Sequence, residues 1–454
     1  MRALLFNPWI ADFAAFDHWT RPLNLLRLAS LLRRLDWEVE LYDCLDRRLQ
    51  EIPGCAKPKR HRLNPFGAGH YYREAIPAPP AVRFIPREFK RYGVPIDVVE
   101  KSLREMAVPD VILIPCMMTY WYPGAEEAIC MMRRVFPKAC VILGGVYAAL
   151  CRGHAEIHSG ADAIITGRHW PEIVNRIAAA VGGKTESYGD GKTWIEPAYD
   201  LLRGDSCLPL VTSIGCPCRC AYCATHSLWP QFIQYPMEAA ADSIERCVKE
   251  FHATDLVFYD DALLINREKH FLPLMEECLR RRVKARFHTP NALHVRQIDE
   301  ETSRMLKRAG FVTIRLGLET AQPSLQRETG SKVDTEDYRR VMRLLLDAGF
   351  SAREVGTYLL LGLPGQSPES AWEACRLAAE CGSEIRIAMI SPIPGTPLFE
   401  RKTDDFVIDH RSDPLLHNNS LTPWRLRRFT QEEIRRLERF AAETNGILRK
   451  NGLF

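Results

Sequence analysis

Short apolar runs alternate with longer amphipathic stretches in two separate series along this chain of 454 residues. Strands that alternate with helices in this way indicate parallel sheets with helices packed against them. Residues 182–204, which hold GGK and YGDGK, separate the two series and are typical of a linker. The sequence therefore predicts two α/β domains in succession.

The first series predicts a doubly wound parallel sheet over residues 1–181, and ligands of such sheets bind beyond the carboxyl ends of the strands. One connection is unusual, because residues 44–109 are far longer than a normal link between two strands. Their segment FGAGHYYREAIP (66–77) is rich in aromatic residues, so we expect an ordered insertion. The expected strands are 2–7, 37–43, 110–115, 139–144 and 161–166.

The second series, within residues 205–400, predicts an open partial (β/α)6 barrel, three-quarters of the eightfold barrel. Residues 401–454 follow as a C-terminal tail with a helix, whose start carries a capping box from Thr430 to Glu433. The six expected barrel strands are 208–214, 255–260, 284–289, 312–318, 355–361 and 385–391.

The charge and composition argue against two classes of partner. The net charge of +4 is spread along the chain, so neither nucleic acid nor a membrane surface is indicated, and the basic run at 57–62 is typical of a solvated loop. No apolar stretch approaches the ~18 residues that span a bilayer, and the N-terminus lacks a signal-type apolar region. We therefore expect a cytoplasmic protein whose 15 cysteines are kept reduced.

Four thiols lie close together in SIGCPCRCAYCATH (213–226), directly after the first expected barrel strand. Gly215 and Pro217 argue against buried cysteines on a regular helix, so a loop at the strand end is favoured. Half of a zinc site would need a second close pair of Cys or His, and no such pair follows. A redox pair of Cys220 and Cys223 would belong to a thioredoxin-like fold, which the rest of the chain does not indicate.

The remaining interpretation of the four thiols is an iron–sulfur cluster, because thiolates are the usual cluster ligands and normally four are used. Three ligands from one loop would leave one iron free to bind a substrate or cofactor. Two registers fit the thiols arithmetically. We adopt the spacing Cys-x3-Cys-x2-Cys, which assigns Cys216, Cys220 and Cys223 to the metal and leaves Cys218 as a bystander.

This spacing, with Tyr222 just before the last cysteine, resembles the radical S-adenosylmethionine (SAM) superfamily over about 205–400. The resemblance implies a [4Fe–4S] cluster whose free iron chelates SAM, and an external reductant that drives cleavage of SAM to a 5′-deoxyadenosyl radical. Later segments match as well, at FYDD (258–261), TPN (289–291), GLET (317–320), GLPGQS (362–367) and ISPIPGTPL (390–398). By this resemblance the SAM-binding residues are Tyr222, Asp260, Asp261, Asn291, Glu319 and Pro392.

Residues 1–181 resemble the cobalamin-binding domain that precedes the barrel in one large subclass of this superfamily. The matching segments are MMTYWYPG (117–124), LGGVYAAL (143–150) and SGADAIITG (159–167). Small residues there would let the backbone approach a flat, bulky ligand; the alternative is tight turns with nothing bound. The resemblance implies cobalamin contacts at Thr119, Tyr120, Gly144, Gly145, Tyr147 and Gly167.

The chain departs from the cobalamin patterns in two places. GRHWPE (167–172) stands where the subclass often has Gly-Glu-x-Glu, and the Asp-x-His-x-x-Gly pattern of other cobalamin enzymes is missing. The subclass usually lacks the second pattern too, so the resemblance implies cobalamin without a histidine below the cobalt. Tyr120 and Tyr147 are candidates for that side by position.

The resemblance therefore implies SAM-derived radical chemistry on an unactivated carbon of a small molecule or peptide, performed by a cobalamin-dependent methyltransferase. One alternative is a radical SAM enzyme without cobalamin that catalyses dehydration, cyclisation or rearrangement. An alternative of another class is a non-catalytic iron–sulfur electron carrier, which SAM binding would distinguish from both enzymes.

Overall fold

In the computed structural model the chain folds into two compact units. Unit 1 consists of Met1–Arg203 with His410–Asn418, and unit 2 of Gly204–Asp409 with Asn419–Phe454. The basic run at 57–62 and the YGDGK segment at 188–192 lie outside the described residues. The described residues are 1–47, 66–185, 193–202, 204 and 206–451.

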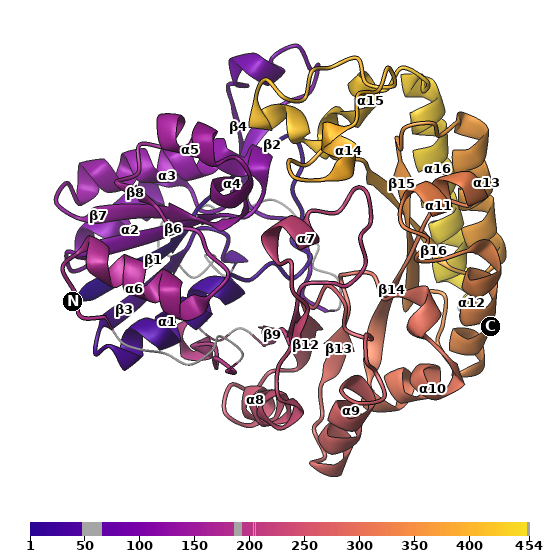
Figure 1. Ribbon diagram of the computed structural model, residues 1–454, viewed down its shortest axis with the longest axis horizontal. Coiled ribbons are helices and arrows are strands. Elements are labelled where there is room, and N and C mark those ends of the chain that lie inside the picture. Colours follow the sequence, from indigo (N-terminus) through magenta and orange to yellow (C-terminus); the bar gives the residue numbers. More distant parts are fainter. Residues whose placement is uncertain (48–65, 186–192, 203, 205, 452–454) are drawn as a thin grey trace. The chain divides into compact units, whose positions relative to one another are not determined.

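Unit 1 contains a five-stranded parallel sheet with the strand order β3-β1-β6-β7-β8, which confirms the predicted doubly wound sheet. The chain moves from β1 to one edge at β3 and then returns past β1 to fill the other side (Figure 1). In such sheets a ligand crevice forms beyond the carboxyl ends of the two strands where the order reverses, here β1 and β6. The strands are β1 (Arg2–Asn7), β3 (Glu38–Asp43), β6 (Val111–Cys116), β7 (Cys140–Gly144) and β8 (Ala163–Ile164).

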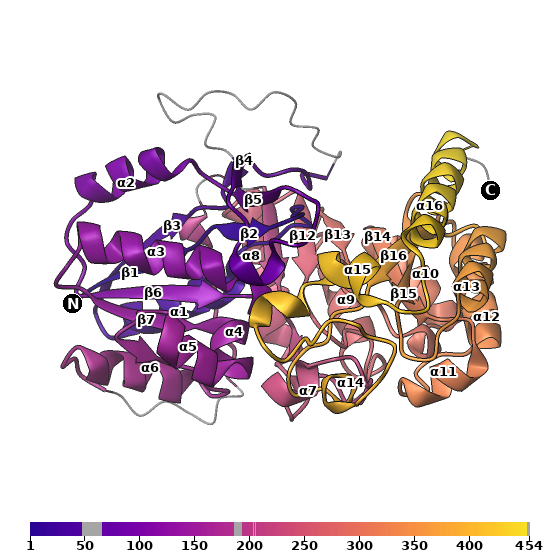
Figure 2. The same ribbon diagram turned by 90° about the horizontal axis from the view of Figure 1, so that it is seen from above.

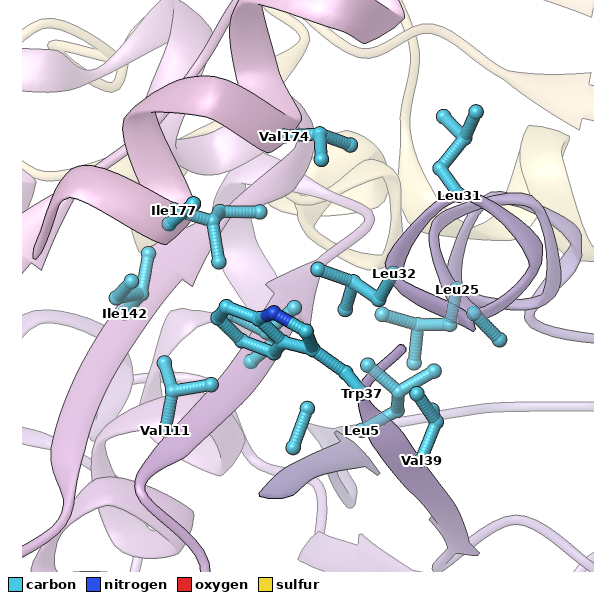
Figure 3. Close-up of a cluster of buried hydrophobic side chains, with 14 of the residues drawn as sticks. Leu5, Leu25, Leu31, Leu32, Trp37, Val39, Val111, Ile142, Val174 and Ile177 are labelled. Carbon is cyan, nitrogen blue, oxygen red and sulfur yellow. The ribbon is translucent and has the colours of Figure 1, made fainter. Parts of the chain in front are cut away.

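Amphipathic helices cover both faces of this sheet. On one face the indole of Trp37 lies among apolar side chains of α1, α6 and the strands (Figure 3). Each fully buried aliphatic side chain in such a cluster contributes about 1.5–3 kcal/mol. On the other face α2 contacts α3 (Figure 2). The helices are α1 (Leu23–Arg34), α2 (Ile96–Glu105), α3 (Tyr122–Val135), α4 (Gly145–Leu150), α5 (Arg152–His158) and α6 (Trp170–Ala180).

Residues 66–109 of the long insertion contain α2 and two strands, and these strands join a third strand from outside the insertion. β2 (Ile10–Asp12), β5 (Phe89–Tyr92) and β4 (Arg73–Ile76) pair in that order as an antiparallel sheet. Its aromatic residues are partly structural, because Tyr71 and Tyr92 are buried in a small apolar cluster.

A segment that follows the barrel in sequence, His410–Asn418, packs into unit 1. The side chain of His417 shares a hydrogen bond with Thr119 (Nδ1 to Oγ1, 2.9 Å), and the amide of Asn418 donates to Asp12 (2.8 Å). Tyr122 donates its phenolic hydrogen to Asp413 (3.2 Å). This segment therefore holds η3 (Thr119–Trp121) and the start of α3 at the carboxyl end of β6.

Unit 2 contains six parallel strands that pair in the order β16-β15-β14-β13-β12-β9, so each strand lies next to its neighbour in sequence. Helices lie along the outer side of the strands, as in a partial (β/α)6 barrel (Figure 1). This confirms the predicted barrel. The strands are β9 (Cys207–Leu210), β12 (Asp255–Phe258), β13 (Arg286–His288), β14 (Phe311–Glu319), β15 (Val355–Leu361) and β16 (Glu384–Met389).

The C-terminal helix α16 (Gln431–Asn451) begins at the predicted capping box. The backbone N–H of Thr430 donates to Glu433 (2.7 Å), and the backbone N–H of Glu433 donates to the Thr430 hydroxyl (3.2 Å). Among the described helices, none is long and apolar enough to cross a membrane. The other helices of unit 2 include α7 (Thr225–Leu228), α8 (Met237–Lys249), α9 (Phe271–Arg280), α10 (Glu300–Ala309), α11 (Pro323–Glu328), α12 (Thr335–Asp347), α13 (Pro368–Glu380), α14 (Pro397–Glu400) and α15 (Thr422–Arg425).

Candidate functional site

The thiol-rich segment is a loop whose two ends are joined by a short antiparallel ladder. β10 (Ser213–Ile214) pairs with β11 (Ile233–Gln234) on either side of the loop. Gly215 starts the loop with φ +81°, and a Cβ atom there would lie 2.5 Å from the carbonyl oxygen of Gln231. Only glycine fits this approach, so the loop starts in a fixed direction.

The C-terminal end of α11 and the start of α14 hold the middle of this loop. The backbone N–H of Ala221 donates to Thr329 (3.3 Å), and the backbone N–H of Leu398 donates to Ala221 (2.9 Å). Gly330 has φ +121°, and a Cβ atom there would lie 3.2 Å from the Cα of Cys220. Segments far apart in sequence thus fix the loop backbone near its third thiol.

The four thiols of the loop differ in their surroundings. Cys220 is buried, whereas Cys216, Cys218 and Cys223 are half-buried. The Sγ of Cys216 lies 3.6 Å from Nε2 of His294. The sulfurs of Cys216 and Cys218 and a ring nitrogen of His294 all lie within 4.8 Å of one another. Cys223 donates instead to the Thr225 hydroxyl (3.3 Å).

The close pair of thiols favours one thiolate. Hydrogen bonds from Cys216 and then from His294 lower the pKa of Cys218. The shared hydrogen bond with Cys218 and burial raise the pKa of Cys216. A proton is therefore lost easily from one of the two sulfurs, and thiolates are the form in which cysteine binds metals.

The two carboxylates after β12 that are predicted to bind SAM, Asp260 and Asp261, have different surroundings. Asp260 is buried and accepts hydrogen bonds from the backbone N–H (3.0 Å) and hydroxyl (2.8 Å) of Thr212 and from the hydroxyl of Ser213 (2.7 Å). It therefore braces the strand end that leads into the thiol loop. Burial, and then the neighbouring Asp260, raise the pKa of Asp261 to about 6. Asn291 donates to the backbone carbonyl of Tyr259 (2.9 Å).

Glu319 ends β14 next to a buried lysine that sequence analysis did not select. The Nζ of Lys332 lies 2.8 Å from Glu319 Oε1 and donates to the Tyr222 hydroxyl at 3.5 Å. Glu319 has φ +65°, a conformation that is rare for a non-glycine residue and concentrated at functional sites. Burial alone would lower the pKa of Lys332, but the Glu319 carboxylate and nearby thiols raise it, so the lysine stays charged.

The remaining predicted residue of this unit, Pro392, is buried just after β16. The following turn is closed by Thr396, whose hydroxyl donates to the carbonyl of Ile393 (2.7 Å). The ring of Tyr222 packs against an apolar cluster that includes Leu398 and Ile390. The structure thus brings Tyr222, Glu319 and the turn after β16 to the thiol loop.

The predicted cobalamin contacts lie at the carboxyl edge of the sheet in unit 1, but most of their side chains are not free. Tyr120 and Tyr147 are buried, and the hydroxyl of Tyr147 shares a hydrogen bond with His154 (2.7 Å). Thr119 is also buried, and its hydroxyl shares a hydrogen bond with His417. The chain is open to solvent at Met117, Gly145 and Gly167, which follow β6, β7 and β8. Backbone, rather than tyrosine hydroxyls, is therefore presented at this edge.

Close packing within the fold also favours glycine at three positions of this edge. Gly145 has φ +88°, and a Cβ atom there would lie 2.6 Å from the carbonyl oxygen of Cys116. A Cβ atom on Gly144 would lie 3.1 Å from the carbonyl oxygen of Ile165. A Cβ atom on Gly167 would lie 2.9 Å from the side chain of Ile173. Close packing of the turns explains these small residues whether or not a ligand binds there.

Comparison with known proteins identifies the domain that holds the thiol loop. Residues 210–378 match the model of the radical SAM superfamily, and this stretch holds the thiol loop, Glu319 and Lys332. Residues 210–378 therefore form a radical SAM domain within unit 2. The family implies a [4Fe–4S] cluster and SAM, and the donor set of unit 2 fits both, with four thiols on one loop and carboxylates at the adjoining strand ends.

The likeness to solved radical SAM enzymes extends through both units. TsrM, a radical SAM methyltransferase from Kitasatospora setae, superposes with a TM-score of 0.66 and 15% identity over 92% of this chain and 85% of its own. OxsB, a cobalamin-dependent SAM radical enzyme, superposes with a TM-score of 0.55 and 14% identity over 96% of this chain and 56% of its own. At these identities the likeness shows a shared fold.

One curated relative is named for a cyclisation reaction. The anaerobic magnesium-protoporphyrin IX monomethyl ester cyclase of Cereibacter sphaeroides is 24% identical over 341 residues. That alignment covers 67% of this chain but only 55% of the cyclase, so the chain spans little more than half of the relative's length.

Two polar residues of the site, His294 and Lys332, were missed by sequence analysis. Both follow segments that it selected, since His294 comes three positions after Asn291 and Lys332 comes beyond α11, 13 positions after Glu319. No local sequence pattern marks either residue, because only the folded barrel brings them to the thiol loop.

Proposed function

We propose that this protein is a cobalamin-dependent radical SAM methyltransferase that acts on an unactivated carbon of a small molecule or peptide. The observation that carries the proposal is the extent of the fold likeness to TsrM, which holds both cobalamin and a [4Fe–4S] cluster in its solved structure. That likeness covers 92% of the chain and so includes unit 1 as well as the barrel. A likeness confined to the barrel would support SAM chemistry alone.

In this proposal Cys216, Cys220 and Cys223 hold the cluster, and Cys218 is left over. The bound cluster supplies the electron that cleaves SAM, and bound cobalamin carries the methyl group. The glycine at the start of the loop and the ladder between β10 and β11 support the assignment, because they fix the loop in one shape before metal binds. Preorganised ligands lose less conformational entropy on binding.

The residues proposed for SAM are Tyr222, Asp260, Asp261, Asn291, Glu319 and Pro392, with distinct roles. The Glu319 carboxylate, oriented by Lys332, is suited to accept hydrogen bonds from SAM hydroxyl or amino groups. Asp260 acts indirectly, by bracing Thr212 ahead of the thiol loop.

Cobalamin is proposed to bind at the carboxyl edge of the unit 1 sheet, near the strand-order reversal between β1 and β6. Solvent-open backbone at Met117, Gly145 and Gly167 suits contact with a large flat ring. Because the Tyr147 hydroxyl already binds His154, the peptide groups of this edge would make the contacts. His417 and Asn418 would then position the segment after β6 from the side.

A second candidate is a radical SAM enzyme that uses the adenosyl radical without cobalamin, for cyclisation, dehydration or rearrangement. The cyclase relative from Cereibacter sphaeroides favours it. The methyltransferase would pass the methyl group of SAM to cobalamin, whereas the second candidate would use only the adenosyl radical. Isotopic labelling of the methyl group can therefore distinguish the two candidates.

The deciding experiment is anaerobic reconstitution with hydroxocobalamin, removal of the excess, and incubation with methyl-labelled SAM and a reductant. The methyltransferase proposal predicts stoichiometric corrin retention and transfer of the label from SAM to the corrin. No retained corrin, with 5′-deoxyadenosine still formed, would contradict it and favour the second candidate. If the protein does not bind SAM at all, the remaining interpretation is a non-catalytic iron–sulfur electron carrier.

Single alanine variants test the proposed cluster ligands. Replacing Cys216, Cys220 or Cys223 should abolish SAM cleavage and reduce iron well below the about four atoms per chain that a cubane cluster holds. Cys218→Ala is the matched control from the same loop and should keep both. Loss of the cluster in Cys218→Ala, with retention in Cys216→Ala, would show that the register is wrong.

A further inference from the structure

The proposed function gives no role to a buried histidine that lies beside the thiol loop. His294 follows β13 and is 7% exposed, and its Nε2 lies 3.6 Å from the Sγ of Cys216. The chain on both sides of it is fixed, because Leu293 donates its backbone N–H to Arg315 (2.7 Å) and Gln297 donates to the His294 carbonyl (2.9 Å). The barrel therefore fixes the backbone that places the His294 ring next to the sulfurs.

The two ring nitrogens of His294 have unequal surroundings. Its Nδ1 is buried and lacks a hydrogen-bond partner among the described residues. Its Nε2 faces the sulfurs of Cys216 and Cys218. A neutral imidazole has one donor and one acceptor nitrogen, and a sulfur that binds iron is an acceptor. The tautomer with hydrogen on Nε2 is the one that satisfies this geometry.

We infer that His294 is a positioning residue that donates its Nε2 hydrogen to a cysteine sulfur of the cluster and thereby raises the cluster's reduction potential. The inference rests on the proposed ligation by Cys216. Reduction adds negative charge to the iron–sulfur core and its sulfurs, and a hydrogen-bond donor stabilises that charge. The external reductant would then transfer its electron more readily.

The test is an anaerobic redox titration of the cluster, followed by electron paramagnetic resonance. His294→Leu removes the donor, and His294→Gln keeps an N–H on a side chain of similar reach. We expect a more negative midpoint potential in the leucine variant and an intermediate or wild-type value in the glutamine variant. An unchanged potential in His294→Leu, or equal shifts in both variants, would overturn the inference.

His270→Leu is the matched control, because His270 is also buried in unit 2 with an unpartnered Nδ1, but its Nε2 contacts the carbonyl of Tyr235 (3.1 Å). Replacing a histidine that is merely structural should lower the unfolding temperature and leave the reduction potential of the cluster unchanged. Iron content and the resonance of the wild-type protein report the cluster separately, so absence of a cluster would refute the proposed function rather than the hydrogen bond alone.

A measurement on the folded wild-type protein avoids dependence on the leucine variant. Histidine labelled with ¹⁵N should give a weak coupling to the reduced cluster in pulsed electron spin resonance, and the coupling should vanish in His294→Gln. A strong coupling would mean direct ligation of iron by His294, and no coupling would mean no contact; either result would overturn the inference.

Discussion

The ion pair between Lys332 and Glu319 yields a prediction whose size follows from the structure. Their charged atoms lie 2.8 Å apart, and the two side chains are only 14% and 10% exposed. At an effective dielectric constant of about 20, such a pair attracts with about 6 kcal/mol before desolvation is counted. Removing one partner of a buried pair typically costs about 3–5 kcal/mol, because the other charge is left uncompensated.

Lys332→Met keeps most of the side-chain volume but leaves the Glu319 carboxylate buried without its cation. We expect the free energy of unfolding of unit 2 to fall by about 3–5 kcal/mol in anaerobic urea titrations. The double variant Lys332→Met with Glu319→Gln should recover much of the loss, since neither charge then remains. SAM affinity should fall in both variants.

Arg401→Met is the control for this prediction, because Arg401 and Glu328 form an exposed pair at 3.1 Å with exposures of 55% and 51%. Breaking a solvated pair should cost no more than about 1 kcal/mol. If Lys332→Met costs as little as this control, or if the double variant is as unstable as the single one, the buried-pair account is refuted.

Two further predictions concern buried carboxyl groups. Asp260→Leu should leave the N–H and hydroxyl of Thr212 without an acceptor, costing about 1–3 kcal/mol per group, and should lower the iron content after reconstitution, whereas Asp260→Asn should retain more iron. Wild-type iron content in the leucine variant would show that this brace is dispensable. In unit 1, burial and then Asp413 raise the pKa of Glu126 from 4.5 to about 7, so the folded state holds this proton more tightly than the unfolded state. The stabilisation is present below pH 4.5 and is lost as the pH rises to about 7, a change of about 3 kcal/mol. Glu126→Gln should flatten this slope of unfolding free energy against pH and be more stable than wild type at pH 8; an unchanged slope would refute the assignment.

Much of the fold could be predicted because its signals are local. Each barrel strand is an apolar run followed by an amphipathic helix, and the capping box at Thr430 and Glu433 needs only four residues. The thiol loop was equally visible, since Gly215 and Pro217 exclude a regular helix at that place.

The features that were missed depend on pairing across long separations. β2 pairs with β5 some eighty positions later, and the segment 410–418 contacts residues near the N-terminus and after β6. Periodicity carries no information about such partners. Lys332 and His294 became site residues only because the barrel brings separate strand ends to one loop, which their own sequence neighbourhoods do not reveal.

The central claim is that three thiolates of one loop hold a [4Fe–4S] cluster and leave one iron open for SAM. Mössbauer spectroscopy of protein reconstituted with ⁵⁷Fe, recorded with and without SAM, tests it most directly. The account predicts that one of the four irons changes its spectrum when SAM is added, and that Cys218→Ala behaves in the same way. Four irons that remain equivalent and unaffected by SAM, or a cluster that is lost in Cys218→Ala, would contradict it.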